Sequence, residues 1–526
     1  MGPQLDLPDR YNAATDFLDS NLEAGRGGKV ALRTDAGDLT YAQVAAQANR
    51  AGNALRELGI EQENRVLLAL LDTPEFPATF FGALKIGSIP IPVNTNLKSQ
   101  DYAYFLNDSR AKAAVVSAPL ADLFRPVRGE LKHLKHLIVV GEAGPGELGY
   151  AEITAAAADR LSPADTGRDD MAFWQYSSGT TGFPKGVVHL QHDMRICTEL
   201  YAKGVLGIGE SDVCFSVAKL YFAYGLGNAL YFPFAAGATA VLLPGPPAPA
   251  TVIDVVRRFR PTLYFAVPTS YANTLAADPE VWSQADFSSV RICVSAGEPL
   301  AGSLLERWRA KTGKEILDGI GTTEICHIFV SNRPGQVRPD SSGTVVPGYE
   351  VKVVDSEGAL VPDGEVGTLL VKGDSICAFY WNKHERTKKT ILGDWINTGD
   401  QYLRDPDGYL HYKGRADDML KVSGIWVSPI EVETVVNAHD AVLECAVVGI
   451  ADENQLVHAE AFVVLQPGRV AGPELEEALR AHVRERLAHF KCPRDFHFVE
   501  ALPKTATGKI QRFKFRESRA PERAPA

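Results

Sequence analysis

The stretch YSSGTTGFPKGVVH, residues 176–189, gathers the residue types that bind phosphate groups. It has three glycines, four Ser or Thr hydroxyls and one cation, Lys185, between two apolar segments. Glycines let the backbone turn so that several N–H groups point at one anion, and hydroxyls and a lysine add donors. The spacing G-x-x-G-x-x-K differs from the G-x-x-x-x-G-K-[ST] of P-loop NTPases. The stretch is therefore a phosphate loop of another kind or a flexible turn.

Three other segments carry residues suited to nucleotide chemistry. Glu324 in DGIGTTE is a candidate ligand for Mg²⁺, which prefers oxygen ligands and usually bridges to substrate phosphates. Asp400 in NTGD can accept both hydroxyls of a ribose, and Lys509 follows a Thr-Gly turn in LPKTATGKIQR. Taken singly, each also fits an ordinary loop, as a solvated Glu, a turn Asp or a solvent-facing Lys.

Together these segments resemble the adenylate-forming superfamily, which includes acyl-CoA synthetases, nonribosomal-peptide adenylation domains and firefly luciferase. Five motifs occur in the right order: YSSGTTGFPKG, SAGEPL, DGIGTTE, NTGD with GRADDMLKVSG, and LPKTATGK. The resemblance covers nearly the whole chain. KLYFAYGLGNALYFP, GIGTTEICHIF and DDMLKVSGIWVSP look closest to the benzoate–CoA ligases and their 4-hydroxybenzoate relatives.

The resemblance implies an ATP-dependent aryl-CoA ligase that uses Mg²⁺, with a small aromatic carboxylate, ATP and coenzyme A as substrates. The carboxylate attacks the α-phosphate of ATP to give an acyl-adenylate and pyrophosphate. The thiolate of CoA then attacks the acyl carbon, and AMP leaves. No protein nucleophile is needed, because the work is positioning and charge neutralisation. This fits the lack of a recognisable Ser-His-Asp or Cys-His set in the sequence.

The resemblance also implies roles for single residues in binding the nucleotide. Thr323 bonds the α-phosphate, Glu324 is the Mg²⁺ ligand, and Asp400 binds the ribose with Arg415 nearby. Lys509 reaches between the substrate carboxylate and the α-phosphate, where two anions must approach each other. The residues around the β- and γ-phosphates are Ser177, Ser178, Gly179, Thr180, Thr181, Gly182 and Lys185. The residues around adenine and the start of the phosphate chain are Gly297, Glu298, Pro299, Asp318, Ile320, Gly321 and Thr322.

One position departs from the family pattern. Many members carry an aromatic residue where this chain has Ile320, so stacking on adenine is replaced here by aliphatic contact. We expect ATP binding to survive this change. Asp318 is expected to accept a hydrogen bond from the adenine amino group.

The C-terminal motifs imply a domain movement between the two half-reactions. In the family, the small domain closes over ATP, then rotates, withdraws the lysine and presents another face to CoA. Asp417 in GRADD matches the hinge position, and the loop from Lys421 to Gly424 lines the pantetheine channel. Without the other motifs, GRADD would be interpreted as a charged turn. In the family the lysine matching Lys509 is also acetylated, which would make an acetyltransferase and a deacetylase partners of this chain.

The acyl pocket implied by the resemblance lies between YFAYGLG and GIGTTEICH. Small residues beside aromatic ones leave a flat slot that suits a benzene ring better than a fatty chain. From composition alone, the same cluster fits an apolar core. Benzoate fits most simply, since a 4-hydroxyl group needs a polar partner such as Tyr221, Ser216 or a loop carbonyl. The pocket residues are Phe222, Ala223, Tyr224, Gly225, Ile320, Gly321 and His327, the last either bonding the carboxylate or closing the pocket.

Two other functions stay open. The first is an adenylating enzyme that loads a carrier protein instead of CoA, although the aryl-CoA-ligase motifs favour CoA. The second is a catalytically idle nucleotide-binding homologue. The presence of Lys185, Glu324, Asp400 and Lys509 counts against the idle protein, because a mere sensor would not need Lys509.

The elements that position these motifs read as an α/β fold. Apolar runs such as NRVLLALLD and AKAAVVS alternate with helical patterns such as LTYAQVAAQANRAGNALRELGI, which predicts largely parallel sheets. From about residue 340, short strands separated by Gly, Asp and Pro turns predict a small barrel-like subdomain, and a small mobile α+β unit follows. We expect an N-terminal adenylation domain over 1–416 and a mobile C-terminal domain over 417–526.

Composition limits the partners and the compartment. The 526 residues carry a net charge of −11, with a sequence pI of about 5.6, which argues against a dedicated nucleic-acid surface. Seven cysteines occur singly, so a disulfide framework or a zinc site is not indicated. No secretory signal or bilayer-length apolar run is visible. We expect a cytoplasmic protein without nucleic-acid or membrane partners, and a homodimer stays open.

Overall fold

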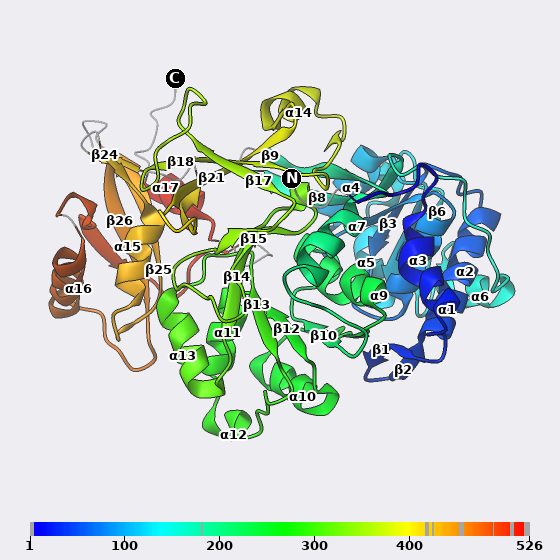
Figure 1. The fold of residues 1–526 in the computed structure, drawn as a ribbon, viewed down its shortest axis with the longest axis horizontal. Helices are drawn as coiled ribbons and strands as arrows, with labels where there is room; N and C mark the ends of the chain where they lie inside the picture. The colour runs from blue at the N-terminus through cyan, green and yellow to red at the C-terminus, as the bar shows by residue number, and fades with distance from the viewer. Residues whose placement is uncertain are drawn as a thin grey trace.

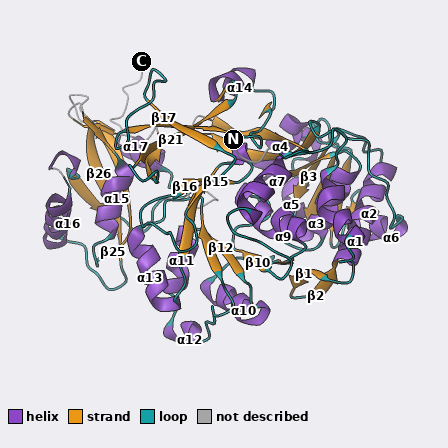
Figure 2. Ribbon diagram, viewed as in Figure 1, coloured by secondary structure: helices purple, strands orange, loops and turns teal. Residues whose placement is uncertain are grey.

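The structure is a computed structural model, and it describes residues 5–179, 182–415, 420–422, 425–451, 457–487, 489–504 and 510–519. Two sheets with parallel strands and covering helices make up most of the chain, followed by an antiparallel sheet and a small C-terminal α+β unit (Figures 1 and 2). This arrangement confirms the predicted α/β fold class. The predicted boundary at residue 417 lies outside the described residues.

The first sheet is built from strand–helix–strand units near the N-terminus. All its strands pair in parallel, and helices connect β3, β4, β5 and β6 in chain order, whereas a loop joins β6 to β7. Its apolar runs are buried along nearly their whole length, as expected for strands covered on both faces. The strands in spatial order are β4 (Ile89–Pro92), β3 (Arg65–Ala69), β5 (Ala113–Ser117), β6 (His136–Val140) and β7 (Leu148–Gly149). The helices are η1 (Thr15–Asp19), α1 (Ser20–Glu23), α2 (Tyr41–Glu57), α3 (Glu75–Lys85), α4 (Ser99–Ser109), α5 (Ala118–Phe124), η2 (Arg128–Glu130) and α6 (Tyr150–Ala156).

A nine-stranded sheet forms the centre of the molecule. Its strands in spatial order are β16 (Thr344–Val345), β15 (Ile328–Ser331), β14 (Ile316–Gly321), β13 (Ile292–Ser295), β12 (Leu263–Ala266), β10 (Val213–Ser216), β11 (Thr239–Val241), β1 (Val30–Thr34) and β2 (Gly37–Thr40). Strands β14 to β1 pair in parallel, whereas β2 at one edge and β15 and β16 at the other pair antiparallel. SAGEPL leaves β13 and DGIGTTE ends β14, so two motifs meet at the carboxyl edge, where open α/β sheets bind ligands.

Helices between these strands pack the sheet against the first one. Phe81 of α3 contacts Phe234, with ring centroids 5.2 Å apart, inside an apolar core shared by the two sheets. The helices of this part are α7 (Asp193–Cys197), η3 (Thr198–Lys203), α8 (Ala223–Leu226), η4 (Gly227–Tyr231), α9 (Phe232–Ala236), α10 (Pro249–Phe259), α11 (Pro268–Leu275), α12 (Pro279–Trp282), α13 (Gly302–Thr312) and η5 (Thr323–Ile325).

The glycine-rich motif lies in a β-hairpin with long strands, where the sequence predicts a phosphate loop or a flexible turn. Strand β8 (Met171–Gly179) and strand β9 (Gly182–Leu190) pair antiparallel, with Ser177 opposite Lys185. The apolar flanks AFWQY and GVVHL carry the strand pairing into the motif from both sides. A short strand, β19 (Phe379–Tyr380), pairs with β9 and brings a segment distant in sequence to the hairpin.

The β-rich segment, predicted to be a barrel-like subdomain, forms a five-stranded antiparallel sheet. Its strands are β17 (Glu350–Val354), β18 (Val366–Lys372), β21 (Trp395–Arg404), β20 (Ile391–Leu392) and β22 (Leu410–Arg415), and helix α14 (His384–Thr390) precedes β20. The C-terminal unit contains β23 (Leu420–Val422), β24 (Ile425–Val427), α15 (Pro429–Asn437), β25 (Val442–Ala451), β26 (Val457–Leu465), α16 (Pro473–Arg486), η6 (His489–Lys491), β27 (Asp495–Phe498) and α17 (Arg512–Arg519). Among the described residues, no helix has the length and apolarity needed to cross a membrane.

Candidate active site

The phosphate hairpin meets the DGIGTTE motif through one buried ion pair. Lys185 Nζ on β9 lies 3.0 Å from Glu324 Oε1 on the turn after β14. Ser177 on β8 donates a hydrogen bond of 3.3 Å to the same oxygen. Motifs that are far apart in the sequence therefore converge on one carboxylate.

Tyr380, which sequence reasoning missed, completes this cluster. Its hydroxyl donates to Glu324 Oε1 at 2.9 Å and accepts from Lys185 Nζ at 2.8 Å. It reaches the site because β19 pairs with β9, a contact between segments distant in sequence. No spacing or composition signal separates Tyr380 from other aromatic residues, so only the strand pairing identifies it.

The electrostatics of the cluster favour a charged carboxylate. Side-chain exposure is 13% for Lys185 and 15% for Glu324. Burial raises the pKa of Glu324, but the charge and hydrogen bond of Lys185, with that of Tyr380, outweigh it and hold the pKa below its usual value. Burial and the Glu324 charge raise the pKa of Tyr380, so its phenol keeps its proton. The contacts from Lys185, Ser177 and Tyr380 all fall on Oε1.

This donor set fits a magnesium ion shared with a nucleotide. Among the described residues, no group of three or more His, Cys, Asp or Glu side chains is placed to enclose a metal. Mg²⁺ usually keeps several waters and is held by one or two carboxylates together with substrate phosphates. The single, largely buried carboxylate of Glu324 beside the glycine-rich hairpin fits this mode of Mg²⁺ binding.

Asp400 and Arg415 face each other across strands β21 and β22. Asp400 is buried, and Arg415 Nη1 donates to its Oδ1 at 2.9 Å and to the Thr398 carbonyl at 2.8 Å. A Cβ on Gly399 would lie 2.7 Å from the Arg415 guanidinium, so glycine permits this approach. The predicted ribose pair is thus assembled, with Asp400 oriented by its neighbour.

The predicted adenine side lies at the ends of β13 and β14. Gly297, Glu298 and Pro299 form the loop after β13, where Thr269 Oγ1 donates to Glu298 Oε2 at 2.9 Å. Asp318 on β14 is buried, and burial raises its pKa well above the ordinary value. Its Oδ1 has no hydrogen-bond partner among the described residues.

The predicted acyl-pocket residues come together around His327. Its Nε2–H donates to the Tyr224 carbonyl at 3.2 Å, and its ring lies 4.5 Å from that of Phe232. Burial lowers the pKa of His327 to about 3, so the ring is neutral. Its Nδ1 then accepts only, and a carboxylate, which also only accepts, cannot bond to it. This favours the alternative in which His327 closes the pocket.

The other predicted pocket and nucleotide residues frame this group. Tyr224 begins α8 with Ala223 and Gly225, and its hydroxyl donates to the Val294 carbonyl at 3.1 Å. Phe222 precedes the helix and stacks edge-on with Tyr221 at 4.5 Å. Ile320, Gly321, Thr322 and Thr323 follow one another from β14 into η5.

Several predicted residues lie outside what the structure describes. Ser178, Gly179, Gly182 and Lys421 are described by their backbone alone, in β8, β9 and β23. The residues outside the described ranges are Thr180, Thr181, Asp417, Gly424 and Lys509.

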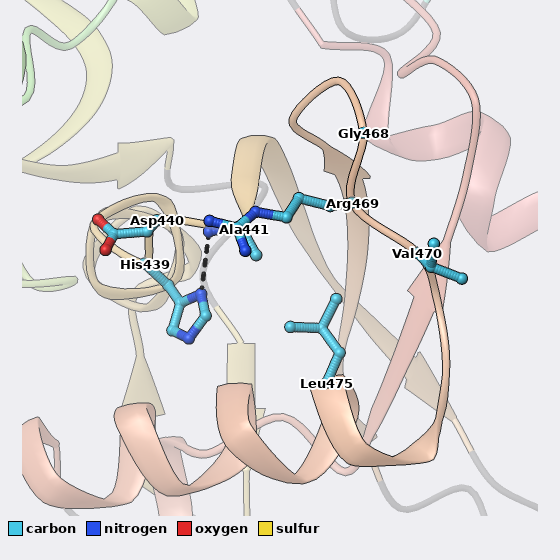
Figure 3. A pocket seen from close by; sticks show the side chains of 7 residues that line it. All are labelled: His439, Asp440, Ala441, Gly468, Arg469, Val470 and Leu475. Carbon is cyan, nitrogen blue, oxygen red and sulfur yellow. Dashed lines mark hydrogen bonds between the residues drawn. The ribbon is translucent and has the colours of Figure 1, made fainter.

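Two cavities lie away from the gathered motifs. One, of about 440 Å³, lies in the C-terminal unit, with His439, Asp440 and Arg469 among its lining residues (Figure 3). The other, of about 420 Å³, lies near Arg291 and Lys314, at the amino ends of β13 and β14. Neither contains a residue of the five motifs, and the second is at the opposite end of the strands from the site.

The SAGEPL and DGIGTTE motifs lie at one edge of the central sheet, beside the glycine-rich hairpin and the largely buried carboxylate of Glu324. Together these features indicate an enzyme that uses a nucleotide. Comparison with protein families agrees: the model for AMP-binding enzymes matches residues 20–381, and the model for their C-terminal domain matches residues 431–509. The chain belongs to the AMP-binding enzyme family. This confirms the predicted membership in the adenylate-forming superfamily.

Within that family, the chain is similar to enzymes that act on aromatic acids. The benzoate–CoA ligase of Thauera aromatica is 50% identical over 98% of this chain and 98% of its own. The 4-hydroxybenzoate–CoA/benzoate–CoA ligase of Rhodopseudomonas palustris is 43% identical over 96% of this chain and 94% of its own. A crystal structure of the anthranilate CoA ligase AuaEII with anthranoyl-AMP has a TM-score of 0.94 and 44% identity, covering 98% of each chain.

Proposed function

We propose that this protein is an AMP-forming aryl-CoA ligase that converts benzoate, ATP and CoA into benzoyl-CoA, AMP and pyrophosphate through benzoyl-adenylate. The observation that carries the proposal is the Lys185–Glu324 pair at the phosphate hairpin, in a chain that matches benzoate–CoA ligases over nearly its whole length. A cation and a metal-ready carboxylate placed together suit a triphosphate, which brings several negative charges to one point.

In this function the hairpin and the turn after β14 divide the work on ATP. Lys185 and the hydroxyls of the hairpin bind the β- and γ-phosphates, and Thr323 bonds the α-phosphate. Glu324 holds Mg²⁺, which when bound neutralises phosphate charge during attack by the carboxylate. Tyr380, already in contact with both charged side chains, keeps them in place.

The remaining nucleotide residues orient AMP. Asp400, fixed by Arg415, accepts the ribose hydroxyls. Gly297, Glu298 and Pro299 flank adenine, which makes aliphatic contact with Ile320. Asp318 accepts a hydrogen bond from the adenine amino group.

The C-terminal unit supplies the second cation and the CoA face. Lys509, the last residue matched by the C-terminal family model, neutralises the meeting of carboxylate and α-phosphate. We place the domain boundary and hinge at Asp417, so that 417–526 turns against 1–416 and brings Lys421 and Gly424 to the pantetheine arm. Acetylation of Lys509 would remove its charge and stop adenylation.

The pocket geometry favours benzoate over its 4-hydroxy derivative. Ser216 Oγ donates to the Ala218 carbonyl at 2.9 Å, so its hydrogen is not free to bond a 4-hydroxyl. Tyr221 lies within 3.5 Å of the Asn96 amide. A neutral His327 packed between aromatic rings closes an apolar slot.

All seven cysteines are free, which fits a reducing cytoplasm, and a homodimer stays open.

The test is ATP-dependent thioester formation with benzoate, 4-hydroxybenzoate, 2-aminobenzoate, cyclohexanecarboxylate and hexanoate, beside Lys509→Ala. We expect benzoate to give the highest kcat/KM and the variant to lose adenylation. A preference for hexanoate would overturn the pocket but not the chemistry. Pyrophosphate exchange without CoA thioester would favour a carrier protein as acceptor. No exchange with any acid would favour the idle homologue.

A further inference from the structure

The turn that carries Glu324 is strained and is held from outside. Cys326, directly after η5, has φ +73, a left-handed value that is unfavourable for a residue with a side chain. Three successive carbonyls of the turn accept hydrogen bonds from elsewhere in the chain. Their donors are His189 Nε2 to Thr323 at 2.7 Å, Cys377 N–H to Glu324 at 2.8 Å and Ser375 Oγ to Ile325 at 2.9 Å.

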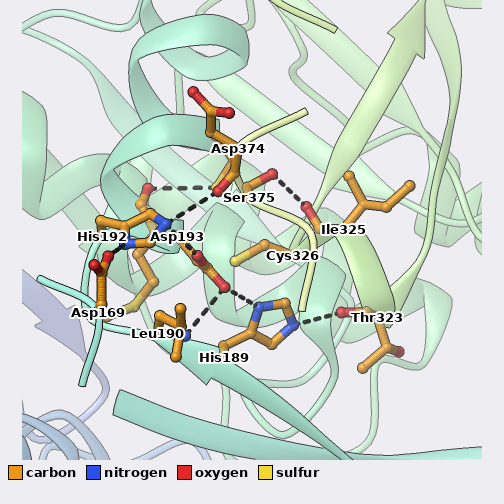
Figure 4. A network of polar contacts seen from close by, with 12 residues as sticks. Asp169, His189, Leu190, His192, Asp193, Thr323, Ile325, Cys326, Asp374 and Ser375 are labelled. Carbon is orange, nitrogen blue, oxygen red and sulfur yellow. Dashed lines mark hydrogen bonds and ion pairs between the residues drawn. The ribbon is translucent and has the colours of Figure 1, made fainter. Parts of the chain in front are cut away.

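Of these three ties, the one from His189 comes from the phosphate hairpin (Figure 4). His189 lies near the end of β9, is fully buried, and stacks on Phe173 of β8 with ring centroids 5.0 Å apart. A carbonyl oxygen can only accept, so His189 Nε2 must carry a hydrogen. The tautomer is therefore fixed by the bond to the turn.

Asp193 fixes the other side of the ring. Its Oδ2 lies 2.7 Å from His189 Nδ1 and also accepts the Leu190 backbone N–H at 3.1 Å. His192 lies 3.2 Å from Asp193 Oδ1 but is hydrogen-bonded to the Asp374 carbonyl. Although burial opposes charge, the hydrogen bonds to Asp193 and to the Thr323 carbonyl, with the charge of Asp193, raise the pKa of His189. The ring thus has a donor on each side.

We propose that His189, oriented by Asp193, is a positioning residue that ties the backbone of the Glu324 turn to the phosphate hairpin and so sets the carboxylate for the metal–nucleotide complex. This inference rests on the proposed function. Strand β9 carries Lys185 toward the phosphates. Four residues further along the same strand, the ring of His189 is hydrogen-bonded to the turn that carries Glu324. Without this tie, the strained turn can relax and move the carboxylate away from the hairpin.

The two ring nitrogens can be tested separately. In His189→Gln the amide nitrogen takes the place of Nε2 and can still donate to Thr323. In His189→Asn it takes the place of Nδ1 and can reach Asp193 but not the turn. His192→Gln is the matched control, because His192 lies beside the network without contacting η5.

The first readout is binding of α,β-methylene-ATP with Mg²⁺ by calorimetry. We expect His189→Asn to weaken binding about 10- to 100-fold, the usual effect of losing a group that orients a metal ligand. His189→Gln should stay within about fivefold of the wild type and His192→Gln within about twofold. The second readout is thioester formation from supplied benzoyl-AMP and CoA, which needs no metal–triphosphate and should change by less than about threefold.

Three results would overturn the proposal. They are equal weakening of binding in both His189 variants, a parallel loss of both readouts, and wild-type binding in His189→Asn. An equal effect of His192→Gln would indicate general loosening and would count against it too. If the wild type binds the analogue but shows no exchange with aromatic acids, the proposed function fails, while the binding ratios still decide this inference.

Discussion

The Tyr380 hydroxyl donates a 2.9 Å hydrogen bond to Glu324 Oε1 and joins strand β19 to the turn after β14. The Tyr380 hydroxyl oxygen accepts from Lys185 Nζ at 2.8 Å, so one phenol contacts both members of the ion pair. Because this hydroxyl is bonded to both members of a pair that is itself in direct contact at 3.0 Å, it helps to hold their relative positions. Tyr380 therefore belongs to the site although no motif contains it.

Tyr380→Phe should raise the KM for MgATP about tenfold and change the KM for benzoate little. The reason is that Lys185 and Glu324 lose the group that holds their relative positions. Benzoate-dependent ATP–pyrophosphate exchange measures both constants. Tyr150→Phe, which removes another buried hydroxyl bonded to Thr79, is the control and should leave both unchanged. An unaltered KM for MgATP in Tyr380→Phe would remove Tyr380 from the site.

Lys185→Met and Glu324→Gln should be strongly coupled in stability. Each single change leaves a largely buried charged group without its partner, whereas the double change leaves no unpaired charge. The melting temperature of the double variant should therefore lie well above the value expected from adding the decreases of the two single variants. The expected coupling is on the order of 1–3 kcal/mol, read as melting-temperature shifts because a chain of this size is not two-state. Each variant should lose adenylation by about 10²- to 10³-fold.

The exposed pair Arg404–Asp363 is the matched control for this double-mutant cycle, in which two single variants and their double variant are compared. Its atoms are 2.6 Å apart, but its side chains are 47% and 42% exposed, so its coupling should be below about 1 kcal/mol. Equal coupling in the two cycles would mean that burial does not set the strength of the Lys185–Glu324 pair.

Asp72 should make stability depend on pH. Burial raises its pKa to about 6 from 3.8, although Lys219, 3.9 Å away, lowers it. Because the folded-state pKa is the higher one, the native state holds the proton longer, and its stability falls as pH rises through this window. The loss is about 3 kcal/mol between pH of about 4 and 6.

Asp72→Asn removes this titration and provides the measurement. The melting temperature of the wild type relative to the variant should fall from pH 4 to pH 6 and then level off. Asp72 Oδ1 accepts the Leu220 N–H at 3.1 Å, and the amide oxygen of Asn can accept it too, so the variant keeps this hydrogen bond at every pH. The pH-dependent part alone tests the shifted pKa, and an offset that is the same at every pH contradicts it.

The sequence predicts the elements of this fold well because their signals are local. The apolar runs of β3 and β5 are buried strands, and the capping residue Thr40 begins α2 as its type suggests. The motifs lie at strand ends, where a parallel sheet collects them at one edge. Lys185 and Glu324 could be placed together on the family resemblance, and the structure gives their distance.

What the sequence could not predict depends on contacts between distant segments. Tyr380 reaches the site only because β19 pairs with β9, and a tyrosine beside a tryptophan carries no positional signal. In the sequence, His189 is a single histidine in an apolar strand. Only the folded structure shows that its ring donates to the Thr323 carbonyl in the turn after β14. The glycine-rich motif was expected as a loop because its composition hides the strand pairing that its apolar neighbours impose.

Gly225→Ala should damage the acyl pocket selectively. A Cβ at this position would lie 2.1 Å from the Lys219 carbonyl oxygen and 2.4 Å from that of Ala218, so α8 must move away from the preceding loop. Tyr224, whose carbonyl holds His327, moves with it. A displacement of this kind can reduce catalysis about 10²-fold by misplacing the substrate. We therefore expect a higher KM for benzoate and a lower kcat, with the KM for MgATP nearly unchanged.

Gly209→Ala is the control for that change, since a Cβ there meets nothing within 4 Å. It should behave as the wild type in thioester formation. Steady-state kinetics with each substrate varied in turn, beside melting temperatures, separate a local effect from unfolding. If Gly225→Ala raises the KM for MgATP as much as that for benzoate, the group around His327 does not form the acyl pocket, and the aromatic cluster is core.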